Sequence, residues 1–291
     1  MLNYYFYRIG QFIALVLPLR LVYGFAVFLA NLHYFFAFRD RRFVKGNLRA
    51  IFPDKPNREL RKISRMVFRN FAKYLVDFFR FEKLNRSYID KNIKLENLHY
   101  FDAALAKGKG VIVLSAHLGN WELGAVVVAQ LGYPFWVVAL PHKTKKVNDF
   151  FDAQRNRKGV KVIALGKAVR SCISEFRNNH MVALAADRDF TEKGILIDFF
   201  GLPTHFPEGP AALSLMTGAS IVPAFMLRNP DDSFTLRIEK PVEFSPTGDK
   251  VKDLAGLITV YNKIFEDYIR RYPEQWYVFR RFWVQDGVSN K

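Results

Sequence analysis

The sequence predicts an α/β fold in which helices flank a mostly parallel central sheet, with a membrane helix at the N-terminus. Three observations carry this prediction. Short apolar segments of strand length, such as residues 111–115 (VIVLS), alternate with segments of helical periodicity. No tract rich in Pro, Gly or Ser divides the body of the chain, and residues 21–38 carry no formal charge. Strands that alternate with helices are typical of a parallel sheet between two helical layers.

The N-terminal apolar stretch indicates membrane attachment. Its 18 residues, 21–38, would span about 27 Å as a helix, slightly short of a hydrocarbon core of about 30 Å. The segment therefore either crosses the bilayer with help from the preceding apolar residues 12–19 or lies within one leaflet. A buried core helix is the alternative. Basic residues follow at once, and the positive-inside rule then places the rest of the chain in the cytoplasm. They are Arg39, Arg41, Arg42, Lys45 and Arg49.

We expect a membrane anchor over residues 1–40 and one further domain over residues 41–291. Apolar periodicity predicts a helix over 56–83 and a long amphipathic helix over 250–272. The remaining expected helices are 121–131, 146–158, 167–179 and one near 208–217. The expected strands are 111–115, 135–140, 181–186, 195–200, 220–227 and 234–239.

Composition restricts the class of partner. The net charge of +17 predicts an anionic partner, which leaves nucleic acid, anionic membrane, phosphorylated lipid or an acidic carrier protein. The single cysteine excludes an internal disulfide and a cysteine-based zinc cluster. Because the basic residues are scattered and match no nucleic-acid module, we expect no nucleic-acid partner. A non-catalytic basic protein that binds membranes or nucleic acid remains the alternative from another class.

The loop after residues 111–115 holds the candidate catalytic residues. His117 follows the strand directly, and Glu122 lies five residues later in the first turn of the next helix. Gly119 lets the loop bring the two side chains together. A carboxylate on one imidazole nitrogen leaves the other nitrogen to take a proton from an alcohol, as acyl transfer requires. Backbone N–H groups at the start of the helix are candidate donors to the oxyanion. We therefore predict that His117 is the general base and that Glu122 orients it.

This loop resembles the His-x4-acid motif of the lipid A late acyltransferases, a family that also contains phosphatidylinositol mannoside acyltransferases. The resemblance extends over nearly the whole chain, in the same order along the sequence. Its other parts are Arg42 to Pro53, Arg155-Asn-Arg157 with Gly159, Asp187-Arg188-Asp189, Phe199-Phe200-Gly201, Gly209-Pro210-Ala211, Thr217-Gly218-Ala219 and Pro273-Glu-Gln-Trp276.

The resemblance implies a glycerol-phosphate-acyltransferase-like fold and an inner-membrane enzyme whose catalytic domain faces the cytoplasm. It implies transfer of an acyl chain from acyl carrier protein to a hydroxyl of a phosphorylated glycolipid, a lipid A precursor. It implies no metal and no other cofactor. The nine Lys and Arg residues within 142–170 agree, because an acidic carrier and an anionic headgroup are both attracted to such a surface.

Five further residues are predicted to bind substrate. Guanidinium groups make paired contacts with phosphate and carboxylate, which suits Arg155, Arg157 and Arg188, although a solvated helix face and a buried ion-pair network are the alternatives. Asn120 is predicted to orient substrate or to satisfy the loop, and Asp187 to act near the site. The other histidines have no partner at a useful spacing and are expected to be incidental. They are His33, His99, His142, His180 and His205.

Some positions depart from the family pattern and leave the acceptor open. Arg188 stands where many relatives have Gln or His, and Glu208 stands where a Thr is frequent. The basic pair Arg280-Arg281 lacks the preceding His. Another bacterial glycolipid, a phospholipid or an aryl-polyene-type lipid is therefore an alternative acceptor. A glycerol-phosphate-type enzyme that uses acyl-CoA is disfavoured, because it has Asp where this chain has Glu122.

Overall fold

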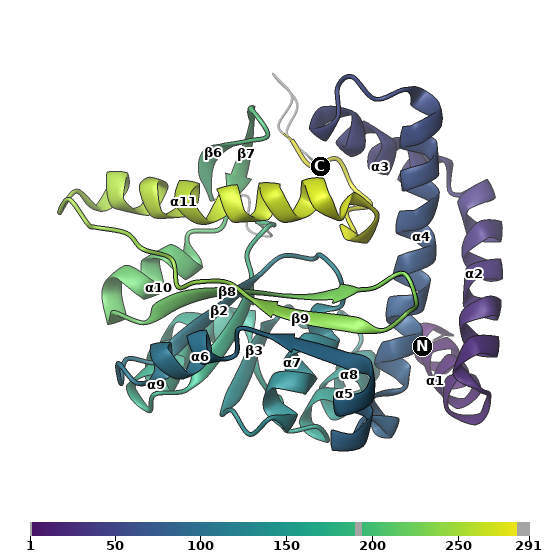
Figure 1. The fold of residues 1–291 in the computed structure, drawn as a ribbon, viewed down its shortest axis with the longest axis horizontal. Coiled ribbons are helices and arrows are strands. Elements are labelled where there is room, and N and C mark those ends of the chain that lie inside the picture. Colours follow the sequence, from purple (N-terminus) through teal and green to yellow (C-terminus); the bar gives the residue numbers. More distant parts are fainter. Residues whose placement is uncertain (1, 190–193, 284–291) are drawn as a thin grey trace.

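A seven-stranded sheet forms the centre of the computed structural model, which describes residues 2–189 and 194–283 (Figure 1). The strand order is β1-β9-β8-β2-β5-β3-β4. Strands β8, β2, β5, β3 and β4 run parallel, and β9 pairs antiparallel with β8. The bounds are β1 Ile93–Glu96, β2 Val111–Ser115, β3 Phe135–Ala139, β4 Lys161–Ala164, β5 Met181–Ala185, β8 Ser220–Arg228 and β9 Phe234–Ile238. The predicted α/β fold with a mostly parallel sheet is confirmed.

Helices cover both faces of this sheet (Figure 1). One face packs against α7 and α8, and the opposite face packs against α9, α10 and α11. The alternation of side chains along β2 shows the division, because Val111 and Val113 belong to the first core and Ile112 and Leu114 to the second. The bounds are α5 Arg86–Asn92, α6 His99–Leu105, α7 Trp121–Gln130, α8 Lys145–Asn156, α9 Ala168–Arg177, α10 Gly209–Thr217 and α11 Lys250–Arg271.

The N-terminal helices stand at one side of the sheet. Helix α4 (Asn57–Phe79) stands beside the turn between β8 and β9, and α2 (Leu19–Phe36) packs along the outer side of α4 (Figure 1). Helix α1 (Leu2–Val16) precedes α2, and α3 (Phe38–Ile51) follows it. Pro18 at the start of α2 separates the first two helices, because proline lacks the N–H that a continuous helix needs.

Helix α2 is largely apolar and mostly exposed, yet it is also part of the folded unit. Within the described ranges it is the one helix long and apolar enough to cross a membrane, and only 17% of it is buried. Its inner face, with Val22, Tyr23 and Ala30, is buried against α4. Its outer face exposes large apolar side chains. They are Leu21, Phe25, Phe28, Leu29, Leu32, Phe35 and Phe36.

The sequence missed the short, half-polar strands. Strand β4 lies at the sheet edge and exposes Lys161 and Ala164, so its apolar run is too short to predict. Strand β1 (IKLE) also carries two charges in four residues. The expected strand 195–200 exists as β6 (Ile195–Phe199), but it pairs with β7 (Leu202–Phe206) in a separate hairpin and does not join the main sheet.

Candidate active site

His117 and Asp187 meet because their two strands are neighbours in register. Strands β2 and β5 pair in parallel with Ser115 opposite Ala185, and His117 and Asp187 each lie two residues beyond this pair. The N–H of Ala186 donates to the Ser115 carbonyl at 2.8 Å and continues the pairing past the strand ends. The carboxyl ends of parallel strands commonly carry functional residues. The two side chains therefore occupy adjacent positions at this edge of the sheet.

Asp187 orients the imidazole. Its Oδ1 lies 2.6 Å from Nδ1 of His117 and also accepts the His117 backbone N–H at 3.0 Å. Because a carboxylate can only accept, Nδ1 carries the proton and Nε2 has the lone pair. Oδ2 of Asp187 accepts the indole N–H of Trp276 at 3.1 Å. Asp187 is completely buried, whereas the imidazole is partly exposed.

The two groups differ in the direction of their pKa shifts. Burial lowers the pKa of His117 below its ordinary value of 6.5, although Asp187 opposes this effect. Burial alone would raise the pKa of Asp187, but the contacts with His117 outweigh it and hold the pKa of this carboxyl well below its usual range. At neutral pH the pair therefore consists of a neutral imidazole and a carboxylate, the state that a general base needs.

Glu122 does not contact the ring nitrogen that the sequence assigned to it. Its carboxylate forms a two-pronged ion pair with Arg155, at 2.8 Å from Nε and 2.5 Å from Nη2. Both side chains are buried, and Asp152 lies 3.1 Å from the remaining Nη1 of Arg155. The imidazole contact predicted for Glu122 is thus made by Asp187, which is bonded to Nδ1 of His117. The guanidinium predicted to bind phosphate is engaged by two carboxylates instead.

The side chains of Asn120 and Arg157 take no part in the His117–Asp187 bond. Asn120 is buried, and its Oδ1 accepts the Leu123 N–H at 3.1 Å as the N-cap of α7. Its Nδ2 donates to Asp77 on α4 at 2.8 Å. Its amide thus satisfies a backbone N–H at the end of the loop, which is the alternative that the sequence left open. Arg157 is exposed at the C-terminal end of α8, where it is on the protein surface.

Arg188 points into the space beside the pair. It is partly buried, it lines the central cavity, and it donates through Nη2 to the carbonyl of Tyr277. Its Nε is buried, makes no hydrogen bond to the residues that the structure describes, and lies 3.9 Å from Oδ2 of Asp187. A guanidinium that lines a cavity is a candidate to bind an anionic group of a ligand.

The loop from His117 to Glu122 is held by backbone contacts on both sides. The N–H of Gly119 donates to the Gln275 carbonyl at 2.9 Å, and the N–H of Asn120 donates to the Met226 carbonyl at 2.7 Å. The backbone N–H of Tyr277 donates to the His117 carbonyl at 3.0 Å. Because the N–H of Gly119, Asn120 and Leu123 are used within the protein, those of Trp121 and Glu122 are the first-turn donors of α7 that remain for a ligand in this part of the structure.

A cavity of about 780 Å³ opens at the imidazole and extends below α7. His117, Glu122, Arg155 and Arg188 line its polar end. The rest of its wall is mostly apolar and rich in small side chains, which leave space between α7 and the sheet. These include Val113, Gly124, Ala125, Val128, Phe135, Ala183, Ala185, Ala224 and Met226. The volume is typical of a site for a small molecule, and the apolar lining suits a hydrocarbon chain.

Comparison with known proteins decides the family. The model for bacterial lipid A biosynthesis acyltransferases matches residues 1–285. The chain belongs to this family. It is therefore an acyltransferase, and the predicted resemblance is confirmed. A phosphatidylinositol mannoside acyltransferase of Mycobacterium tuberculosis is 28% identical over 223 residues, 75% of this chain and 69% of that protein. The lipid A biosynthesis lauroyltransferase of Escherichia coli is 25% identical over 285 residues, 94% of this chain and 90% of that protein.

Several residues of this acyltransferase site were missed from sequence. Asp187 was predicted to act near the site, but its bond to the imidazole was not, and the position of His117 and Asp187 just after two expected strands was the available signal. His142, expected to be incidental, lines the cavity. Trp276 was noted only as part of a closing motif, yet it binds Asp187. Within the described ranges, no group of three or more His, Cys, Asp or Glu side chains is placed to hold a metal ion.

Proposed function

We propose that this acyltransferase moves a fatty acyl chain from acyl carrier protein to a hydroxyl of a lipid A precursor. The observation that carries the proposal is the His117–Asp187 pair at the polar end of an apolar cavity. Relatives support the acceptor class, because they include lipid A acyltransferases of Haemophilus influenzae and Escherichia coli. The net charge of +17 supports an acidic carrier as donor and an anionic lipid as acceptor.

In the proposed reaction, Nε2 of His117 takes the proton of the acceptor hydroxyl as its oxygen attacks the thioester carbonyl. The imidazolium that forms is stabilised by the negative charge of Asp187. The tetrahedral intermediate then collapses, the C–S bond breaks, and the imidazolium returns the proton to the leaving thiolate. The products are the ester and the free thiol of the carrier. The N–H groups of Trp121 and Glu122 are the proposed donors to the oxyanion.

The remaining predicted residues have supporting roles in this proposal. Glu122 contributes negative charge near the imidazole, and Arg155 holds its carboxylate at the start of α7. Arg188 is proposed to contact an anionic group of a substrate, because its guanidinium brings positive charge to the lining of the cavity. Asn120 shapes the loop rather than touching substrate, and Arg157 belongs to the basic surface available to the carrier.

We place the enzyme at the cytoplasmic face of the inner membrane. The exposed apolar side of α2 supports contact with hydrocarbon, since such patches on soluble surfaces are rarely large. The basic residues of α3 follow directly and suit anionic headgroups. This orientation brings the acceptor lipid and the enzyme to the same surface.

The proposed function is tested by incubating the purified enzyme with acyl carrier protein thioesters of several chain lengths and a lipid A precursor in vesicles. Mass spectrometry is expected to find one added acyl group on the precursor. A phosphatidylinositol mannoside serves as the second acceptor, because mycobacterial relatives carry that name. Transfer only to the mannoside, or no transfer from acyl carrier protein with good transfer from acyl-CoA, would contradict the corresponding half of the proposal.

The lowered pKa of His117 predicts the pH dependence of the reaction. Only the neutral imidazole accepts a proton, so kcat/KM is expected to rise with pH and to reach its plateau through an apparent pKa below 6.5. The measurement is a pH profile of kcat/KM for the acyl carrier protein thioester. An acidic limb centred above 6.5 would show that the protonation of His117 does not follow the burial seen here.

A further inference from the structure

Another buried carboxylate lies close to the site, and the proposed reaction does not use it. Asp77 is on α4 and is 7% exposed. Three groups from three other elements bind it. Tyr23 of α2 donates its hydroxyl to Oδ1, Arg228 at the end of β8 pairs with Oδ2, and Asn120 of the catalytic loop donates to Oδ2 at 2.8 Å. These four residues are called the Asp77 network below.

Asn120 connects this network to the catalytic loop. It lies between His117 and Glu122, and its amide faces two ways: Oδ1 caps the first turn of α7, and Nδ2 reaches Asp77. The direction of the first turn of α7, and with it the position of Glu122, therefore depends on where Asp77 stands. Asn120 has few alternative positions, because its backbone N–H is fixed on the Met226 carbonyl at 2.7 Å.

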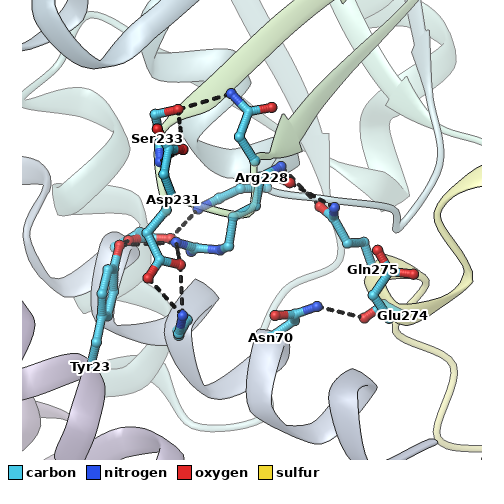
Figure 2. A network of polar contacts seen from close by, with 12 residues as sticks. Tyr23, Asn70, Arg228, Asp231, Ser233, Glu274 and Gln275 are labelled. Carbon is cyan, nitrogen blue, oxygen red and sulfur yellow. Dashed lines mark hydrogen bonds and ion pairs between the residues drawn. The ribbon is translucent and has the colours of Figure 1, made fainter. Parts of the chain in front are cut away.

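Arg228 connects the network to the other side of the same loop. Figure 2 shows Arg228 with Tyr23 on one side and Gln275 on the other. Its Nη1 lies 3.1 Å from the Tyr23 hydroxyl, and its backbone N–H and carbonyl both bind the Gln275 side chain at 2.9 Å. The carbonyl of Gln275 in turn accepts the Gly119 N–H. The loop is thus tied to Asp77 from two directions.

The charges of the network favour a fixed arrangement. Burial disfavours the charged guanidinium, but the charge of Asp77 outweighs this effect and raises the pKa of Arg228. An ion pair of this kind is no better for stability than a well-packed apolar cluster, although removing one partner is costly. The ion pair differs from an apolar contact because its hydrogen bonds fix the relative orientation of the side chains, which apolar packing restricts less strictly.

Tyr23 gives the network a link to the membrane side of the molecule. It lies on the inner face of α2, the helix whose outer face exposes the apolar side chains. We propose that the Asp77 network is a positioning device for acyl transfer: it aligns the loop from His117 to Glu122 with the helix that attaches the enzyme to the membrane. This inference rests on the proposed function, and it assigns Tyr23, Asp77 and Arg228 positioning roles that reach the loop through Asn120 and, from Arg228, through Gln275.

The test uses Tyr23→Phe and Asn120→Ser in the full-length protein, singly and together. Tyr23→Phe removes only the hydroxyl, which donates to Asp77 and accepts from Arg228. Asn120→Ser keeps an N-cap oxygen for α7 but removes the donor to Asp77. Each single variant is expected to lower kcat about tenfold, the size of one hydrogen bond to a charged group. Because both changes break one connected path, the double variant is expected to be about as slow as the slower single variant.

Tyr34→Phe is the matched control, because Tyr34 lies on the same helix and its hydroxyl makes only a 3.5 Å contact with the Arg61 carbonyl. It is expected to keep the wild-type kcat, and all four variants are expected to bind phosphatidylglycerol vesicles as the wild type does. A merely structural role would change thermal stability while leaving kcat per folded molecule unchanged. Wild-type kcat in Tyr23→Phe, or multiplied losses in the double variant, would overturn the proposal.

A second measurement separates this proposal from the proposed function. The rate at which diethyl pyrocarbonate modifies His117 reports the loop geometry without any substrate. Tyr23→Phe and Asn120→Ser are expected to change this rate, whereas Tyr34→Phe is expected to leave it unchanged. If the wild type transferred no acyl group but these rates still differed, the proposed function would fail and the positioning role would stand. Equal rates in all variants would refute the positioning role.

Discussion

Replacing Asp187 by asparagine is expected to lower kcat by about 10²–10⁴-fold, the usual contribution of general acid–base catalysis. The asparagine amide has nearly the same shape, but it carries no charge to stabilise the imidazolium. It also offers an N–H to Nδ1 of His117, which favours the tautomer with the proton on Nε2, where the base cannot accept it. KM for the donor is expected to change little, because Asp187 is completely buried behind the imidazole.

Steady-state kinetics with the carrier thioester measure this effect, and thermal melting shows that the variant is folded. Asp90→Asn is the matched control, since Asp90 is exposed and pairs with Arg86 on the same helix. It is expected to keep full activity. A folded Asp187→Asn enzyme with the kcat of the wild type would show that His117 does not act through this carboxylate.

Replacing Gly119 by alanine is expected to remove almost all activity and to destabilise the protein. The backbone of Gly119 has φ of +66°, and an added Cβ would lie 2.1 Å from the Met226 carbonyl oxygen. Neither the strand nor the loop moves without loss of the bond between the Asn120 N–H and that carbonyl. The left-handed conformation costs about 1–2 kcal/mol for alanine, and overpacking adds about 1–3 kcal/mol.

Gly108→Ala separates the two costs. Gly108 also has φ of +66°, but an added Cβ would meet nothing within 4 Å. It is expected to show the conformational cost alone and to keep its activity, as measured by denaturant unfolding and by the transfer assay. If the two alanine variants were equally stable and equally active, the close approach of the loop to β8 would not matter for the site.

The fold was largely predictable because its buried strands are mostly apolar runs. Residues 111–115, 135–140, 181–186 and 220–227 all correspond to strands of the central sheet. The edge strands were not predictable, because they are partly exposed and contain charged residues that interrupt the apolar pattern, as β1 and β4 show. Periodicity also cannot tell a strand of the main sheet from one of a hairpin, which is why 195–200 was placed with the others.

The site was predictable only in part, because its partners come from distant segments. The sequence located His117 through its position after a strand, and it chose Glu122 as the partner because that acid is near in the chain. In the structure the imidazole of His117 contacts Asp187, which is 70 positions away in the sequence. Glu122 pairs with Arg155, which is 33 positions away. Strand order decides such pairings, and the sequence does not state that β2 and β5 are neighbours.

His117 and Asp187 follow two adjacent strands, so the residues proposed for the chemistry come from other segments than much of the cavity wall. Residues 140–180 connect β3 to β5 and contain α8, β4 and α9. None of these elements takes part in the pairing between β2 and β5. Yet this segment supplies Phe151, Leu165, Ala168 and Val169 to the cavity wall. Insertions and substitutions there can reshape the space offered to a lipid while the base and its carboxylate keep their geometry. One scaffold can in this way diversify into enzymes as differently named as a lauroyltransferase, a palmitoleoyltransferase and a phosphatidylinositol mannoside acyltransferase.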